Sequence, residues 1–126
     1  MRTPLALGAL FLATACAPTA MDGPRQPREC FFASEVDSFA SSENRVVYVR
    51  TSRDEVFRLD TFSCGNVDWS QSIGIRPTGG GSSVCSGFDA ELIVPDIGRG
   101  TTTCPVTGVR RLTDAEVAAL NPRDLP

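Results

Sequence analysis

The positions of the cysteines constrain the fold of this chain more than any other feature. Five cysteines occur among the 126 residues, and Cys30, Cys64, Cys85 and Cys104 are spread over residues 30–120. A domain of this size buries only about 60–65% of its unfolded surface. Each disulfide would add about 2–4 kcal/mol to a typical total of about 5–15 kcal/mol. Because no two cysteines are spaced as C-x-x-C, we expect structural disulfides rather than a zinc or redox centre.

Four cysteines allow three pairings, and spacing alone selects none of them. We expect disulfides between Cys64 and Cys85 and between Cys30 and Cys104. The first would close residues 64–85, the stretch with the least hydrophobic patterning. The second would join the first strand to the last, as closing a curled sheet into a barrel requires.

The first half of the domain predicts an antiparallel hairpin. Residues 46–49 form a valine-rich run, and residues 55–62 alternate between apolar and polar side chains. This period of two is typical of a half-buried strand, and the polar segment between them has hairpin length. Residues 30–32 predict a short first strand, whereas residues 35–42 fit a helix or a loop. Residues 77–83 are too rich in glycine and serine for regular structure.

The second half predicts another hairpin and a helix. Residues 90–94 and 101–112 are the expected strands, with Pro105 at a sheet edge or bulge because proline cannot donate a ladder hydrogen bond. Thr113-Asp114-Ala115-Glu116 then has the pattern of a capping box, which begins a helix. The expected fold is therefore mainly β: a small curled antiparallel sheet or barrel, stapled by two disulfides, with one short C-terminal helix.

Residues 1–16 have the pattern of a lipoprotein signal peptide. Arg2 is followed by an uncharged, leucine-rich run that ends in small residues before Cys16. A short cationic head, a short apolar run and small residues at the cleavage point are typical of an exported precursor. We expect residues 1–15 to be removed and Cys16 to carry lipid, which leaves an even number of cysteines. Ordinary cleavage after Ala15, releasing the protein into the periplasm, is the alternative.

Residues 16–29 predict a tether between the lipid and the domain. This segment is rich in proline and poor in apolar residues, a composition that extends by about 3.1 Å per residue. Ala17 follows the cysteine where an aspartate would favour the inner membrane, so we expect an outer-membrane anchor facing the periplasm. The membrane is then one partner, reached through the N-terminal lipid. Residues 121–126 are expected to form a flexible tail.

The composition argues against most catalytic and nucleic-acid functions. The chain has no histidine, and all twelve basic residues are scattered arginines. No basic stripe is present to contact phosphates, so nucleic acid is not an expected partner. Without histidine, the Ser-His-Asp and Cys-His systems and histidine zinc sites are excluded. We expect no catalytic residue, no cofactor and no metal, and we expect the acid pairs Glu35 with Asp37 and Asp54 with Glu55 to be solvated.

Trp69 is the candidate interaction residue. It is the single tryptophan and lies in a loop-rich stretch, and exposed tryptophans often anchor protein interfaces. The competing interpretation, which we favour from sequence, is that Trp69 covers one end of the core beside a disulfide.

Several motifs together resemble a family of small bacterial envelope proteins defined only as a domain of unknown function. The matching features run from Cys30 to Glu116 and are listed here: Cys30, the valine-rich residues 46–49, Cys64, Cys85 with Gly87 and Asp89, Cys104, and Leu112-Thr113 with Glu116. Phe88 separates Gly87 from Asp89, where the family more commonly has an adjacent pair. The resemblance implies no known activity, substrate or catalytic residue.

The function that these observations favour is a non-enzymatic envelope lipoprotein, acting as a binding or assembly module for another envelope protein or an envelope polymer. Two alternatives stay open. One is an inhibitor of a hydrolase that attacks the cell wall. The other is an envelope enzyme that uses only carboxylates and arginine, which would require two carboxylates facing each other about 5–10 Å apart.

Overall fold

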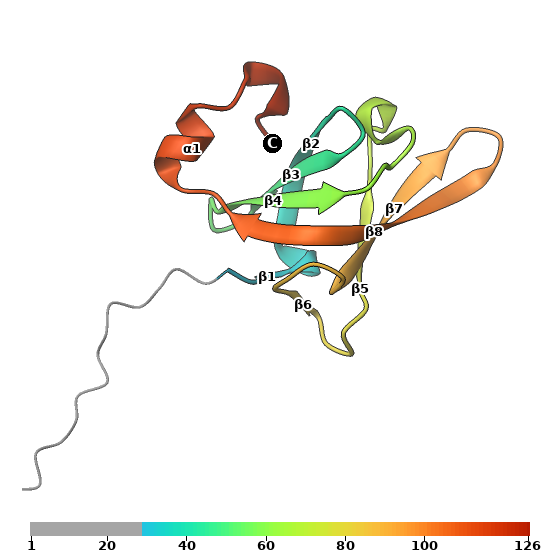
Figure 1. Cartoon of the computed structure of the whole chain (residues 1–126), viewed down its shortest axis with the longest axis horizontal. Helices are drawn as coiled ribbons and strands as arrows, with labels where there is room; N and C mark the ends of the chain where they lie inside the picture. The colour runs from blue at the N-terminus through green and yellow to red at the C-terminus, as the bar shows by residue number, and fades with distance from the viewer. Residues whose placement is uncertain (1–28) are drawn as a thin grey trace, which may run out of the picture.

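A computed structural model describes residues 29–126 of the chain (Figure 1). In this part of the chain, eight strands and one α-helix follow one another, with three short 3₁₀ turns between or after them. In chain order these elements are β1 (Phe31–Phe32), η1 (Ala33–Glu35), β2 (Val36–Ser42), β3 (Val46–Thr51), β4 (Val56–Thr61), η2 (Val67–Trp69), β5 (Gly74–Pro77), β6 (Ser83–Val84), β7 (Ala90–Asp96), β8 (Gly100–Arg111), α1 (Asp114–Ala118) and η3 (Pro122–Asp124).

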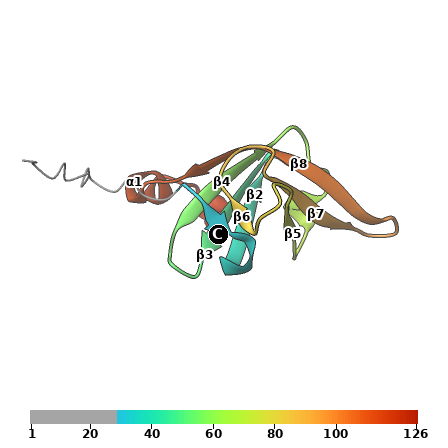
Figure 2. The ribbon, with the colours of Figure 1, turned by 90° about the horizontal axis from the view of Figure 1, so that it is seen from below.

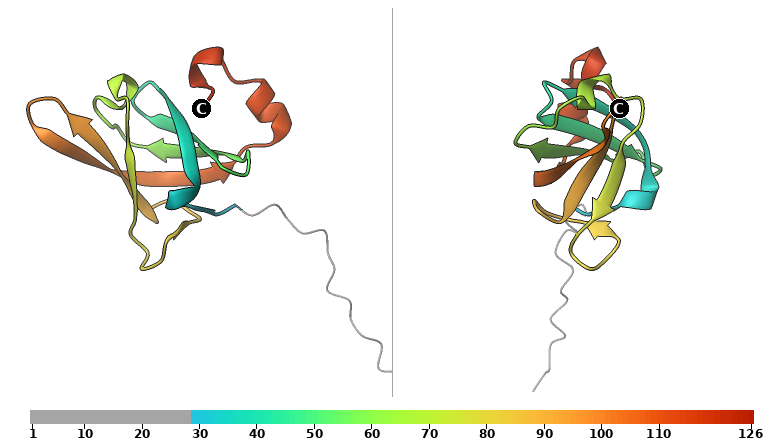
Figure 3. Two further views of the ribbon diagram at one scale, coloured as in Figure 1. Left: turned by 180° about the vertical axis from the view of Figure 1, so that it is seen from behind. Right: turned by 90° about the vertical axis from the view of Figure 1, so that its right-hand side faces the viewer.

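Six of the strands form one antiparallel sheet in the order β2-β3-β4-β8-β7-β5. The sheet curls into a half-barrel, as the views from below and from the end show (Figure 2, Figure 3). The long strand β8 lies in the middle: its residues 100–105 pair with β7, and its residues 106–111 pair with β4. β1 and β6 form a separate two-stranded ribbon. The predicted mainly β fold with one short helix is confirmed.

The hairpin predicted over residues 46–62 is present as β3 and β4. Val47 lies opposite Leu59, and Val49 lies opposite Phe57, so the apolar residues of both strands share one face. Phe57 also contacts Phe31 of β1, with ring centroids 4.8 Å apart. These side chains belong to a core on the concave side of the sheet, which consists of Phe31, Val47, Val49, Phe57, Leu59, Cys64, Val67, Val84, Ala90, Leu92, Val94, Cys104 and Val106.

The opposite face of the β3–β4 hairpin has its own small apolar cluster. Tyr48, Val56 and Leu112 are buried there, and Val117 and Leu120 pack against them. The α1 segment therefore covers a part of the sheet that would otherwise be exposed. Val117 of the helix and Leu120 after it supply the apolar side chains that pack on this cluster.

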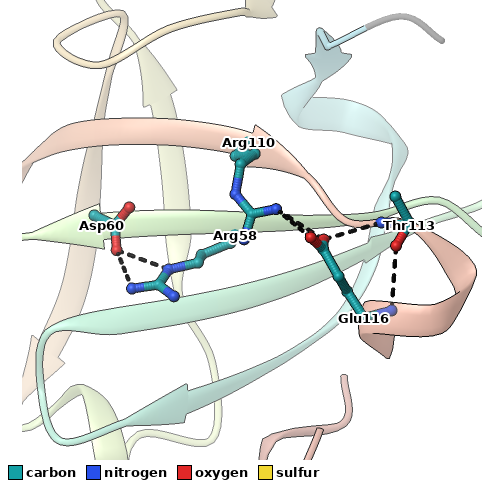
Figure 4. A network of polar contacts seen from close by, with 5 residues as sticks. All are labelled: Arg58, Asp60, Arg110, Thr113 and Glu116. Carbon is teal, nitrogen blue, oxygen red and sulfur yellow. Dashed lines mark hydrogen bonds and ion pairs between the residues drawn. The ribbon is translucent and has the colours of Figure 1, made fainter. Parts of the chain in front are cut away.

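The predicted capping box fixes the start of α1 (Figure 4). The Glu116 amide donates to Thr113 Oγ1 at 3.2 Å, and the Thr113 amide donates to Glu116 Oε2 at 3.1 Å. Arg110 Nη1 donates to both oxygens of Glu116. The hydrogen bond from the Thr113 backbone, and then that from Arg110, hold the pKa of Glu116 below its ordinary value.

The predicted disulfide pairing is wrong. The disulfides join Cys30 to Cys85 and Cys64 to Cys104. Cys30 precedes β1 and Cys85 follows β6, and these two strands pair with Phe31 opposite Val84. The expected link from the first strand to the last would close a barrel, but the sheet stays open because β8 lies at its centre.

The position of β8 also explains the second disulfide. Cys64 follows β4, and β4 pairs with β8, the strand that contains Cys104. The two Cα atoms are 5.6 Å apart, and both side chains are buried in the core. Cys64 therefore bonds to Cys104 on β8, the strand that neighbours β4, rather than to Cys85, the next cysteine in the sequence.

Three further segments refine the sequence predictions. Residues 36–42, which fitted a helix or a loop, form β2, with a register shift against β3 between Val36 and Ser38. Pro105 was expected at an edge or bulge, but it lies in the inner strand β8, opposite Glu91 of β7 and just before the β4-paired part begins, and the register shift follows it between Val106 and Gly108. The C-terminal residues differ from a fraying tail: η3 lies against β2, and Arg50 Nε donates to the Pro126 carbonyl at 3.1 Å.

Candidate interaction surface

Trp69 is exposed and does not cover the core. Its side chain is 86% exposed, whereas Val67, two residues earlier in η2, is fully buried in the core cluster that contains Cys64. The interpretation that Trp69 seals the core beside a disulfide is therefore wrong, because Val67 occupies that place. A 3₁₀ turn directs residues two positions apart to different sides, and here one side is the core and the other is solvent.

The turn that carries Trp69 is tied to the β2–β3 hairpin by hydrogen bonds from backbone N–H groups to side-chain oxygens. The Asn44 amide donates to Asp68 Oδ2 at 3.0 Å, and the Asp68 amide donates to Asn44 Oδ1 at 3.3 Å. The Cys64 amide donates to the Asn44 carbonyl at 2.7 Å. Asn66 adopts a left-handed φ of 67° at the start of the turn, and Ser70 Oγ donates back to its carbonyl at 2.8 Å.

Two depressions meet at Trp69. The first has a volume of about 550 Å³ and lies between η2 and the β7–β8 turn. It is lined by Asn66, Trp69, Ser70, Gln71, Ser72, Pro95, Asp96 and Ile97. Ile97 is fully exposed at the tip of that turn, and Asn66 Nδ2 donates to Asp96 Oδ1 at 3.3 Å across the depression.

The second depression lies on the other side of Trp69, between the end of β2 and η3. It has a volume of about 860 Å³ and is lined by Ser41, Ser42, Glu43, Asp68, Trp69, Asn121, Pro122, Arg123 and Asp124. We refer to the residues that line the two depressions as the Trp69 surface. It combines one exposed aromatic side chain on a hydrogen-bonded turn with polar groups that line both depressions.

Of the four acidic residues named from sequence as possible catalytic pairs, three form ion pairs and the fourth, Asp37, is exposed. Glu35 pairs with Arg53 at 3.1 Å, Asp54 with Arg50 at 3.4 Å, and Glu55 with Arg111 at 3.4 Å. Each of these carboxylates is therefore neutralised by an arginine. Within residues 29–126, no group of three or more histidine, cysteine or acidic residues is placed to hold a metal ion.

Phe88, another exposed aromatic residue, lies on a loop that hydrogen bonds hold in place. Phe88 has a φ of 67° and is 65% exposed, and its amide donates to the Val106 carbonyl at 2.6 Å. Asp89 Oδ2 accepts hydrogen bonds from the amides of Cys85 and Ser86 and from Ser86 Oγ. The Ser86 backbone bond, followed by the Ser86 side chain and the Cys85 amide, lowers the pKa of Asp89.

Sequence reasoning named Trp69 but missed Phe88 and Ile97. Both are large apolar residues inside turns, where polar residues are usual, and this is the sequence signal that could have identified them.

The lipidation site predicted at Cys16, the signal peptide and most of the tether lie outside the described residues. Within the part of the chain that is described, no helix is long and apolar enough to cross a membrane.

The fold and the site define a small disulfide-linked β half-barrel with an exposed tryptophan between two depressions. The chain belongs to a family of unknown function, DUF6491, whose sequence pattern matches residues 1–124. The expected membership in a family without a known function is thus confirmed. Comparisons with curated proteins and with solved structures give no match.

Proposed function

We propose that this protein is a lipid-anchored envelope protein that binds a partner through the Trp69 surface and catalyses no reaction. The observation that carries the proposal is the 86% exposure of Trp69 on a turn held by Asn44 and Asp68. Because this turn is already held by hydrogen bonds, little of the loop has to be ordered when a partner covers the indole. Tryptophan is among the residues that contribute most to binding at such positions.

Two observations support the envelope part of the proposal. The sequence of residues 1–16 is typical of a lipoprotein precursor with Cys16 as the lipid carrier. The remaining four cysteines form two disulfides, which persist in oxidising compartments and are rare in the cytosol. The outer membrane, facing the periplasm, is the location we propose.

Three of the four carboxylates considered from sequence for a carboxylate-dependent enzyme are held in ion pairs. Such an enzyme needs a protonated acid and a free carboxylate across a cleft. Glu35, Asp54 and Glu55 each contact an arginine instead.

Site-specific crosslinking in intact cells tests the proposal. A photoreactive amino acid would replace Ile97, which is fully exposed beside Trp69. The control position is Asp114, an exposed residue at the start of α1. We expect a discrete adduct from position 97 that is lost when Trp69→Ala is added, and none from position 114. Equal labelling from both positions, or no adduct from position 97, would contradict a binding role for this surface.

A further inference from the structure

We infer that the Trp69 surface binds an extended cationic peptide segment of a partner protein, whose arginine or lysine side chains stack on the indole and face the surrounding carboxylates. This inference rests on the proposed function because it assigns the partner of the same surface. It is carried by the shape of the surface, by the distribution of charge over the described residues and by the chemistry of tryptophan.

The charge distribution is the first step. The ion pairs within residues 29–126 involve six acidic residues, all of them outside the Trp69 surface: Glu35, Asp54, Glu55, Asp60, Glu91 and Glu116. The Trp69 surface has four carboxylates, none of which is in those ion pairs: Glu43, Asp68, Asp96 and Asp124. Arg123 is the one basic residue among the residues that line the two depressions. The residues that line the two depressions therefore have four carboxylates and one arginine, whereas the rest of residues 29–126 has ten acidic residues and eight arginines.

Two other arginines are close in sequence and have to be considered. Arg45 follows Asn44, and Arg99 belongs to the same turn as Ile97, but neither lines a depression. Together with Arg123 they make three arginines, against the four carboxylates of the surface. An incoming cationic segment therefore meets most of the negative charge on the side of Glu43, Asp68 and Asp124, whereas on the other side Asp96 shares its turn with Arg99.

Desolvation decides between partner chemistries. Any partner that covers Trp69 also removes water from the nearby carboxylates, and a buried charge without an opposite charge is unfavourable. A neutral polysaccharide offers hydroxyl groups but no positive charge. An anionic lipid surface repels carboxylates. A guanidinium or ammonium group compensates the charge, and over the face of an indole it also gains a cation–π interaction of about 0.5–2 kcal/mol.

The geometry explains why the segment is extended. Trp69 lines both depressions, so a strand-like peptide that crosses the indole can place alternate side chains on its two sides. Glu43 and Asp124 are on one side, and Asp96 is on the other. Arginine is favoured over lysine for such a site because its planar head group stacks and also forms paired hydrogen bonds to carboxylates.

The single tryptophan makes the test specific to this surface. The mature protein would be titrated with a hexa-arginine peptide while the fluorescence of Trp69 is recorded. Hexaglutamate and a neutral N-acetylglucosamine oligomer of equal length serve as the comparison probes. We expect a saturable change with hexa-arginine that weakens between about 50 mM and about 500 mM salt, and no saturable change with the other two.

Matched variants separate a site from general attraction between opposite charges. Glu43→Gln with Asp124→Asn should lower the affinity for hexa-arginine about fivefold, the effect of losing two exposed charge contacts. The control, Asp37→Asn with Asp114→Asn, removes the same charge from exposed carboxylates outside the surface and should leave the affinity unchanged. Trp69→Ala, followed by calorimetry, should also weaken binding.

Each other outcome overturns the inference. Equal weakening by the two double variants would mean non-specific charge attraction, and no fluorescence response to hexa-arginine would mean no cationic site. Saturable binding of the sugar oligomer alone at Trp69 would replace the peptide by a glycan. If the surface binds the glycan, the inference about a cationic peptide is wrong but the proposed binding function stands. The proposed function is contradicted only when crosslinking from position 97 gives no specific adduct.

Discussion

Gly87 lies directly against the backbone of Thr107. A Cβ atom at position 87 would come within 2.0 Å of the Thr107 carbonyl oxygen. The register between β4 and β8 shifts at this point, where Asp60 pairs with Gly108 but Thr61 pairs with Val106. The loop of residues 85–89 therefore packs on the irregular part of β8, and only glycine allows it to come so close.

Gly87→Ala should destabilise the domain strongly. The added methyl group meets backbone rather than a movable side chain, so the loop or β8 has to shift, at a cost of more than about 2 kcal/mol. Gly81→Ala is the matched control, because a Cβ there meets nothing within 4 Å, and its effect should be within about 0.5 kcal/mol of zero. Denaturant unfolding of both variants measures the difference, and similar midpoints would refute the close packing.

Val67→Ala should reduce the stability of the domain more than Trp69→Ala does, whereas Trp69→Ala should be the variant that weakens binding. Val67 is fully buried and Trp69 is 86% exposed, so the smaller change in volume should cause the larger loss of stability. We expect about 1–3 kcal/mol for Val67→Ala and less than about 0.5 kcal/mol for Trp69→Ala. Thermal or denaturant unfolding checks this, and a large loss for Trp69→Ala would mean that the indole packs on the core.

Much of the fold follows from local sequence pattern. The β3–β4 hairpin and the capping box of α1 were predictable because alternation and capping involve residues close together in the chain. The order of strands was not predictable, since nothing local tells β8 to lie between β4 and β7. The disulfide pairing depends on that order, and so the expectation for Cys64 and Cys104 was wrong.

For the candidate site, too, the sequence identifies a residue but not its surroundings. The composition of residues 65–72 singles out Trp69 as the one large aromatic side chain there, but exposure depends on which residue of the turn fills the core. Val67 fills it because Cys64 is fixed to β8 and Asn44 holds the turn. The two depressions bring together residues of β2, η2, the β7–β8 turn and η3, and only the three-dimensional structure places these segments side by side.

Peptide mapping without reduction should recover the links Cys30–Cys85 and Cys64–Cys104. Replacing either pair by alanine should lower the free energy of unfolding by about 2–5 kcal/mol. The loss should be greater for Cys64 and Cys104, whose side chains are buried in the core, because their removal also leaves a cavity. Recovery of a Cys64–Cys85 peptide from folded protein would contradict the fold around β8.

Acid should destabilise the protein partly through Asp89. Its pKa is lowered in the folded protein by the hydrogen bonds from Ser86 and Cys85, so the stabilisation is present above the unfolded pKa of about 3.9. It is lost as the pH falls through the lower folded value. The free energy of unfolding of Asp89→Asn should therefore depend less steeply on pH below about 4 than that of the wild type. Identical slopes would exclude this contribution.

Cys16 should be the N-terminal residue of the mature protein and should carry lipid. The intact mass of protein extracted from membranes should include a diacylglyceryl group on this cysteine. Cys16→Ser should leave the precursor uncleaved or release the domain from the membrane. An unmodified soluble protein that begins at another residue would disprove the anchor and leave ordinary secretion.

The two disulfides interleave along the chain, and this has a consequence for oxidative folding. In order of appearance, the first cysteine of the domain pairs with the third and the second pairs with the fourth. A chain oxidised as it emerges would join Cys30 to Cys64 first, which is not a native link. Thiol–disulfide exchange would then have to break the Cys30–Cys64 link before Cys64 could pair with Cys104 of β8. Correct folding of this domain therefore depends either on oxidation that waits for the whole sheet or on an isomerase that reverses the early pairing.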